Sequence, residues 1–279
     1  MENIQKNERY QEEFLLKQHS GTSVPIHFHR NIEIYGVVRG EVTVVISGEG
    51  RILSEGQMAV IDSLESHSYQ MKGDAEVFQI HIGKKYLRDY YLIYPNRKLP
   101  HWLMDKEHNK KIYENVKQLL SDEEKMELEL RRYGFSCELF ADIIEKCETK
   151  EKRSLSVQDE ELMVKLIEFI YQNYSEKITL NSLAETFYIS PKTLSKKISK
   201  FLNKDLRVFI NDVRVDRVLF MKDEPEYKNK TLNELIELCG FDNIRTFYRS
   251  YSRIYKKSHI EEETSTELEV NSNEKDADL

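Results

Sequence analysis

The chain has 279 residues, of which 39% are hydrophobic, and its formal net charge is −7. This length suits two globular domains with their own apolar cores better than one. Because the N-terminal run MENIQKNERYQEEF is polar and no apolar run is long enough to span a bilayer, we predict neither a signal peptide nor a membrane anchor, and we expect a cytoplasmic protein with no membrane partner.

Residues 1–105 are predicted to form a small β-barrel. Phe14, Leu15 and Leu16 stand in a charged setting and indicate an edge strand or an arm. In residues 41–47, valine and isoleucine alternate with mostly polar residues, as in a strand with one buried face. Glycines that predict turns recur at Gly36, Gly40, Gly48–Gly50, Gly56 and Gly73. Many short strands separated by glycine turns are typical of a barrel or a sandwich.

A group of histidines lies within this barrel. The run PIHFHRNIEIYGVVRG has the spacing H-x-H-x3-E-x6-G at His27, His29, Glu33 and Gly40, and His67 follows in SLESHSYQ. Two residues apart on a strand, His27 and His29 face the same side of the sheet. The spacing resembles the first motif of the cupin barrels, and His67 resembles the histidine of their second motif.

Three interpretations of this group stay open. The first is a divalent metal site of imidazole and carboxylate ligands, formed by His27, His29, Glu33 and His67. The second is a pocket for a small-molecule effector, such as a sugar or another metabolite, formed by the same residues with Tyr35, Tyr69 and His81. The third is a set of hydrogen-bonded structural histidines. The divalent metal is a possible cofactor in the first interpretation, and no cofactor is required in the others.

Residues 106–148 change to a helical pattern with two apolar stripes. They are Ile112, Val116, Leu119 and Leu120, and then Phe135, Leu139, Phe140, Ile143 and Ile144. Because the second stripe is more apolar than a lone surface helix needs, we predict that this segment forms the interface of a homodimer. The alternative is packing against the barrel.

Residues 149–159 are charged, poor in large apolar residues and predicted to be an interdomain linker. The cysteines have no metal-type spacing and fall in apolar helical patterns, so we interpret all three as reduced packing residues: Cys137, Cys147 and Cys239.

Residues 160–260 are predicted to form two helix-turn-helix units in tandem. In the first, Leu180, Leu183 and Ala184 line one face of a helix, and Ser190 with Pro191 suits the start of the next helix. That next helix buries an apolar stripe and leaves a polar, positive face of Lys192, Ser195, Lys196 and Ser199.

The second unit repeats this order. Thr231 caps a helix, Gly240 supplies the turn, and a helix from about Asn243 buries Phe247. The exposed face of that helix is predicted to hold Ile244, Arg245, Tyr248, Arg249 and Ser252. An apolar connecting helix from about Phe209 to Met221 is long enough to hold the two units one DNA turn apart.

Three motifs carry a family resemblance. The pattern I-S-P-x-x-L at Ile189, Arg214 in the connecting helix, and L-x-x-L-I-x-x-C-G-F-D-N-x-x-x-F from Leu232 resemble the DNA-binding domain of the AraC/XylS family over roughly residues 160–255. Tyr188 and Asn203 stand where that family usually has glycine. The resemblance implies double-stranded DNA as a partner, regulation of transcription, in most cases activation, and contact with RNA polymerase.

The distribution of charge agrees with DNA binding. Residues 160–260 hold 18 Lys and Arg against 14 Asp and Glu, whereas residues 261–279 hold 1 against 8 and are predicted to be a disordered acidic tail. Arginine is the side chain best shaped for bidentate contact with guanine, so Arg245 and Arg249 are the strongest candidates for base readers. The full set of predicted DNA contacts is Ser190, Lys192, Thr193, Ser195, Lys196, Asn243, Ile244, Arg245, Tyr248 and Arg249.

The sequence therefore predicts an α+β chain of two domains: a cupin-like sensor barrel with a helical dimerisation segment, and an all-α tandem helix-turn-helix domain. We expect a transcription regulator that responds to a small molecule and is not an enzyme. The alternatives are a constitutive DNA-binding regulator whose barrel only dimerises, and a metal-dependent cupin enzyme such as an isomerase or a dioxygenase.

Overall fold

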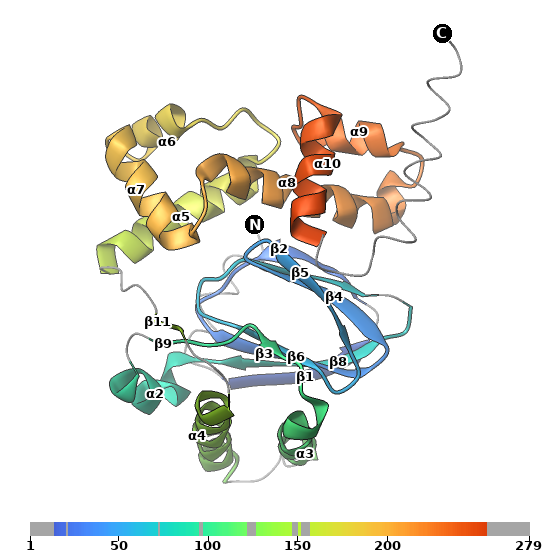
Figure 1. The fold of residues 1–279 in the computed structure, drawn as a ribbon, viewed down its shortest axis with the longest axis vertical. Helices are drawn as coiled ribbons and strands as arrows, with labels where there is room; N and C mark the ends of the chain where they lie inside the picture. Colours follow the sequence, from blue (N-terminus) through green and yellow to red (C-terminus); the bar gives the residue numbers. More distant parts are fainter. Residues whose placement is uncertain are drawn as a thin grey trace.

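The computed structural model describes residues 14–20, 22–71, 73–94, 97–121, 127–146, 150–151 and 157–255. Three layers are visible in Figure 1: helices α5 to α10, two β-sheets beneath them, and helices α3 and α4 on the far side of the sheets. The predicted acidic tail, Cys147 and most of the predicted linker lie outside the described residues.

The two sheets build the N-terminal barrel. One has the order β1 (Phe14–Ser20), β8 (Glu76–Ile82), β3 (Ile32–Arg39), β6 (Met58–Ile61), β10 (Trp102–Leu103). The other has the order β2 (Val24–His27), β7 (His67–Met71), β4 (Glu41–Ile46), β5 (Glu49–Ser54), and a short third pair joins β9 (Arg97–Lys98) to β11 (Lys150–Glu151). All these pairings are antiparallel. The edge strand predicted at Phe14 is confirmed as β1.

Strand β3 is buried on both faces. Ile34 packs toward the helices α3 and α4, and Tyr35, the next residue, packs between the two sheets. The turn predicted at Gly36 is wrong, because Gly36 lies inside β3. A Cβ there would approach the Phe78 ring to 2.3 Å, so the glycine makes room for a core aromatic side chain.

Helices α3 (Lys106–Ser121) and α4 (Leu128–Lys146) cover the outer face of the first sheet, and η1 (Lys84–Tyr86) and α2 (Arg88–Ile93) lie beside α4. Ile112, Val116 and Phe135 belong to one core cluster with strand residues of that sheet. The apolar stripes that led to the dimer prediction are therefore buried within the chain, which was the alternative interpretation. Dimerisation remains a prediction, but these side chains do not supply its interface. Cys137, predicted to be a packing residue, is exposed, whereas Cys239 is buried.

The C-terminal half is helical within the described residues. Its elements are α5 (Val157–Asn173), α6 (Leu180–Thr186), α7 (Pro191–Leu202), α8 (Leu206–Asp223), η2 (Pro225–Tyr227), α9 (Leu232–Leu238) and α10 (Ile244–Tyr255). Helix α8 is the connecting helix, and its residues contribute both to the core of the first unit and to that of the second. The α+β fold of two domains is confirmed.

The turns of the two units have the same hydrogen bonds. Helices α6 and α9 each begin with a threonine capping box, at Thr179 and Thr231. Helix α6 ends with Ile189 N donating to Ala184 O, and α9 ends with Phe241 N donating to Ile236 O, the bond that defines a Schellman motif. This repetition makes the segments two copies of one structural unit.

The left-handed position of each turn is filled differently. Gly240 has φ of 82°, and Tyr188 in the first unit has φ of 54°. Asn203, which ends α7, has φ of 52°. Tyr188 and Asn203 thus adopt the backbone conformation that glycine favours, at positions where the AraC/XylS family usually has glycine.

Candidate functional site

Helix α7 presents the predicted polar face to solvent. The predicted residues are exposed from Ser190 to Lys196, and Leu194 and Ile198 hold the opposite face in the core. The Ser190 hydroxyl accepts from Thr193 N at 3.2 Å and lies 2.7 Å from Thr193 Oγ1. These two residues therefore cap the start of α7. The exposed side chains that remain available to contact a ligand along α7 are those of Lys192, Ser195 and Lys196.

Helix α10 presents two arginines. Arg245 and Arg249, one turn apart, are exposed, and Ile244 is 37% exposed. Asn243 Oδ1 accepts from Arg245 N at 2.7 Å, so Asn243 caps the helix. Tyr248 is half-buried against the Phe247 ring, which leaves the two arginines as the main polar groups of this face.

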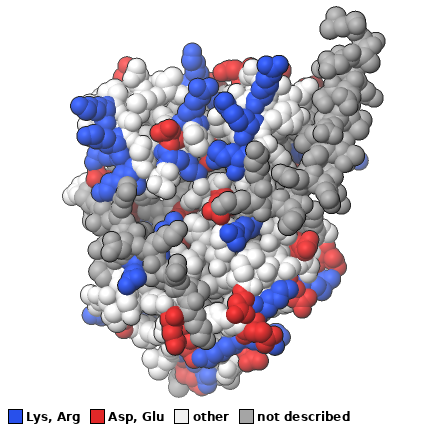
Figure 2. Space-filling view, viewed as in Figure 1, with Lys and Arg blue, Asp and Glu red and all other residues white. Residues whose placement is uncertain are grey.

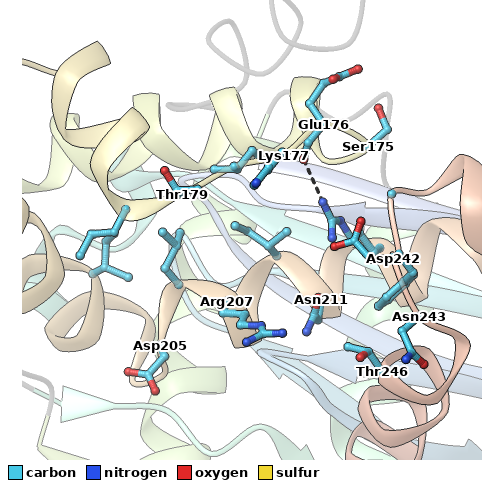
Figure 3. Close-up of a pocket in the computed structure, with 18 of the residues that line it drawn as sticks. Ser175, Glu176, Lys177, Thr179, Asp205, Arg207, Asn211, Asp242, Asn243 and Thr246 are labelled. Atoms are coloured by element: carbon cyan, nitrogen blue, oxygen red, sulfur yellow. Dashed lines mark hydrogen bonds between the residues drawn. The ribbon is translucent and has the colours of Figure 1, made fainter.

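A cleft of about 1030 Å³ separates the two units. Figure 3 shows Arg207 and Asn211 of α8 on one wall and Asn243 and Thr246 at the start of α10 on another. Three basic and four acidic residues line the cleft, so it does not concentrate positive charge. Arg214, part of the family pattern, donates to Tyr174 O at 2.7 Å and to Glu176 O at 2.9 Å, and so braces α8 against the segment after α5.

Positive charge gathers on the surface of the helices. Figure 2 shows lysine and arginine side chains over the upper, helical half of this face, and acidic side chains more often over the lower half. Lys192, Lys196, Arg245 and Arg249 are all exposed on α7 and α10. A polyanion that reaches both helices would meet cations on each.

A second site lies between the two sheets. His27 and His67 are register partners on β2 and β7, whereas Glu33 and His81 are partners on β3 and β8 of the opposite sheet. His29 follows β2. The potential ligand atoms of His27, His29, Glu33 and His67 all lie within 4.8 Å of one another. The structure thus brings together the four residues predicted as metal ligands, with His81 beside them.

The Glu33 carboxylate is the centre of this histidine cluster. Its Oε2 lies 2.8 Å from His29 Nε2, 3.2 Å from His67 Nε2 and 4.0 Å from His81 Nε2. Its Oε1 accepts from Tyr69 OH at 2.8 Å and from Gln79 Nε2 at 2.9 Å. Gln79 was not predicted, because its place in the cluster depends on the pairing of β8 with β3 and has no sequence spacing of its own. Tyr35, also predicted, stacks on Tyr69 at 3.9 Å and lies behind the cluster.

The histidine rings are oriented by main-chain carbonyls. The Nδ1 atoms of His27, His29 and His67 lie 2.9, 3.0 and 2.9 Å from the carbonyls of Pro25, Asn31 and Glu65, respectively. An Nδ1 that donates to a carbonyl turns Nε2 toward the cluster, where Nε2 can donate to the carboxylate while it carries a proton and can bind a cation when it does not. Within the described residues, buried His67 Nε2 makes no contact with hydrogen-bond geometry, and its nearest anionic atom is Glu33 Oε2 at 3.2 Å. A cation at the cluster would satisfy that atom.

Electrostatics favour a neutral His27, a neutral His81 and an ionised Glu33. Burial lowers the pKa of His27 well below its usual value and lowers that of His81 to about 4. Burial raises the pKa of Glu33, but the neighbouring rings of His81, His29 and His67 outweigh it, so the pKa is lowered. Uncharged imidazoles and a carboxylate are the forms that bind divalent transition metals. The donor set therefore fits such an ion.

The comparisons with known proteins concern mainly the barrel. Residues 14–82 match the family model described as Cupin domain, which agrees with the predicted cupin-like barrel. No curated protein matches the chain.

Among solved structures, ToxT from Vibrio cholerae is 12% identical with a TM-score of 0.44, over 86% of this chain and 94% of that one. A second ToxT structure, described as bound to an unsaturated fatty acid, is 12% identical with a TM-score of 0.43, over 86% and 90%. A protein of unknown function from Listeria innocua is 18% identical with a TM-score of 0.30, over 33% and 85%. In the part of the chain that the structure describes, no helix combines the length and apolarity that crossing a membrane would need.

Proposed function

We propose that the chain is a DNA-binding transcription regulator of the AraC/XylS type, with an effector site in its barrel. The observation that carries the proposal is the repeated structural unit, in which a capped helix, a Schellman turn and an exposed recognition helix occur twice around α8. Helices of this kind bind in the major groove, and two of them on one connecting helix suit two successive grooves.

The two recognition helices differ in what they offer to DNA. Helix α7 presents hydroxyls and lysines, which suit phosphate oxygens, and α10 presents Arg245 and Arg249, which suit guanine edges. We infer that α10 supplies most of the sequence specificity and that α7 supplies mainly orientation and affinity.

The first test is Arg249→Ala. A DNA site is first selected from a random library with the full-length protein. We expect the variant to lose about 1–3 kcal/mol of binding free energy on the selected site, roughly 5-fold to 150-fold, with a smaller loss on random DNA. Fluorescence anisotropy at several salt concentrations measures both affinities. Arg88→Ala removes the same charge from an exposed position on α2 and is the control. Equal losses of Arg249→Ala on both DNAs would contradict base reading.

We propose further that the histidine cluster is the effector site and that a divalent transition-metal ion is the ligand it fits best. His27, His29, Glu33 and His67 would hold the ion. When bound, it would neutralise the carboxylate and cross-link the two sheets. The support is the close set of inward donor atoms and the buried His67 Nε2, which has no contact of hydrogen-bond geometry among the described residues.

The second test is metal binding by His67→Gln. We expect the wild type to bind about one Zn²⁺ or Mn²⁺ per chain in equilibrium dialysis, and the variant to bind it at least about 100-fold more weakly, because one ligand is lost. His108→Gln, which alters a histidine of α3, is the control. If neither ion binds the wild type, a thermal-shift screen against sugars and other metabolites tests the cluster as an organic-ligand site.

The resemblance also supports activation, a homodimer, contact with RNA polymerase and a cytoplasmic location. In this proposal any dimer interface uses surfaces other than the buried stripes of α3 and α4. The packing of the histidine-bearing strand β2 against α8 supports a sensing role for the barrel over a catalytic one.

A further inference from the structure

Among the described residues, the barrel contributes one buried side chain to the core of each helix-turn-helix unit. Ile26 of β2 is 3% exposed and packs in the cluster of the first unit, which includes Leu166 and Phe209. Val45 of β4 is 5% exposed and packs in the cluster of the second unit, which includes Val215. Because cores are close-packed, displacement of either strand must alter the packing of a unit.

Two buried carboxylates of α8 lie beside the barrel. Asp212 and Asp216 lie one helical turn apart and are 3% and 6% exposed. Asp216 Oδ2 accepts from the Ile26 amide at 2.5 Å, and the Ser68 hydroxyl of β7 lies beside the same carboxylate. Asp216 is therefore hydrogen-bonded to β2 and lies beside β7, the two strands that carry His27 and His67.

Asp212 joins α8 to the ends of both recognition helices. It accepts from Lys204 Nζ, just after α7, at 2.7 Å and pairs with Arg253 of α10. Lys204 Nζ also donates to Ser47 O, in the turn between β4 and β5, at 2.5 Å. One buried carboxylate thus holds the end of α7, the end of α10 and a barrel turn together.

The contacts of Asp216 are sequence neighbours of the cluster. Ile26 precedes His27 in the chain, and Ser68 follows His67. The ring centroids of His27 and His67 are 4.1 Å apart. Successive residues of a strand point to opposite faces, so the histidines face the barrel interior and their neighbours face α8. A displacement of His27 or His67 therefore also moves its neighbour in the chain, Ile26 or Ser68, and these neighbours lie against Asp216.

We propose that the Asp216 contact with Ile26 and Ser68 is a regulatory joint, through which binding at the histidine cluster changes the DNA affinity of the two helix-turn-helix units. This inference rests on the proposed function. Asp216 is the first contact on α8, and the packing of Ile26 and the bonds of Asp212 extend the effect to α7 and α10.

The test compares the full-length wild type with Asp216→Ala. The measured quantity is the ratio of the Kd for the selected DNA without Zn²⁺ to the Kd with saturating Zn²⁺. We expect this ratio to differ from 1 by at least about 5-fold in the wild type, in either direction, which is the usual size of such coupling. In Asp216→Ala, with Zn²⁺ binding confirmed by dialysis, this Kd ratio should lie within about 2-fold of 1.

The control is Asp223→Ala, at an exposed position of α8, which should keep the wild-type Kd ratio. A wild-type ratio in Asp216→Ala would overturn the proposal.

Hydrogen exchange gives a second readout that needs neither DNA nor an Asp216 variant. Zn²⁺ should change the exchange of α8 amides around residues 210–218 by at least about 5-fold. If Zn²⁺ does not bind, His67→Gln takes its place as the perturbation of the cluster, and the same change is expected. Unchanged exchange in α8 would overturn the joint. A chain that shows the change but binds no DNA would refute the proposed function, and only the coupling between the histidine cluster and α8 would remain supported.

Discussion

Replacing Glu33 by leucine is expected to lower the free energy of unfolding by about 3–5 kcal/mol, the usual effect of removing one partner from a buried charged network. Glu33 is 0% exposed, and its two oxygens receive Tyr69 OH, Gln79 Nε2 and His29 Nε2. The variant leaves these buried groups without an acceptor, and each such loss costs about 1–3 kcal/mol before the structure relaxes.

Urea unfolding followed by circular dichroism measures this loss. Glu41→Leu, at an exposed position of β4, is the matched control and should change stability by less than about 0.5 kcal/mol. A loss below about 1 kcal/mol in Glu33→Leu would mean that the carboxylate does not hold the cluster together. Glu33→Leu should also bind no divalent ion in dialysis, because the one carboxylate of the donor set is gone.

Replacing Gly240 by alanine is expected to destabilise the second helix-turn-helix unit by about 3 kcal/mol. A Cβ at this position would lie 2.3 Å from Ser175 O, which is a backbone atom. The φ of 82° adds about 1–2 kcal/mol for any residue with a Cβ, and the displaced backbone adds a similar amount.

The equivalent position of the first unit supplies the matched comparison. Tyr188 already carries a side chain there with φ of 54°, and it is 98% exposed. Tyr188→Gly removes the left-handed strain but loosens the unfolded chain, so stability should rise by between 0 and about 1 kcal/mol. Hydrogen exchange of α9 and α6 amides reports on each unit separately. A harmless Gly240→Ala would show that the turn can open away from Ser175.

The helix-turn-helix units were predictable because their signals are local. A threonine cap, an apolar repeat and a serine followed by proline act over a few residues, and the structure has α6, α7, α9 and α10 where these signals occur. What the sequence did not reveal is that Tyr188 and Gly240 share one backbone conformation. Left-handed geometry at a tyrosine is set by the helices on either side of it.

The histidine cluster was predictable in part. The spacing of His27, His29 and Glu33 spans the end of β2, the turn after it and the start of β3, and His67 came only with the cupin resemblance. Gln79 and the place of His81 depend on β8 lying beside β3, a pairing between strands about forty residues apart. No local spacing encodes such a pairing.

The sequence by itself determined which segments have an apolar face, while the tertiary structure decided what covers each face. The stripes of α3 and α4 were visible as hydrophobic periodicity, and the fold buries them on the barrel. In β4, Val45 belongs to the strand face opposite the barrel core, and it is buried because the second helix-turn-helix unit packs on it. The burial of Asp212 and Asp216 could not be predicted either, because the carboxylate of an aspartate in a helix is normally expected to face solvent. Periodicity reports burial along one element, whereas the partner depends on contacts between residues far apart in the chain.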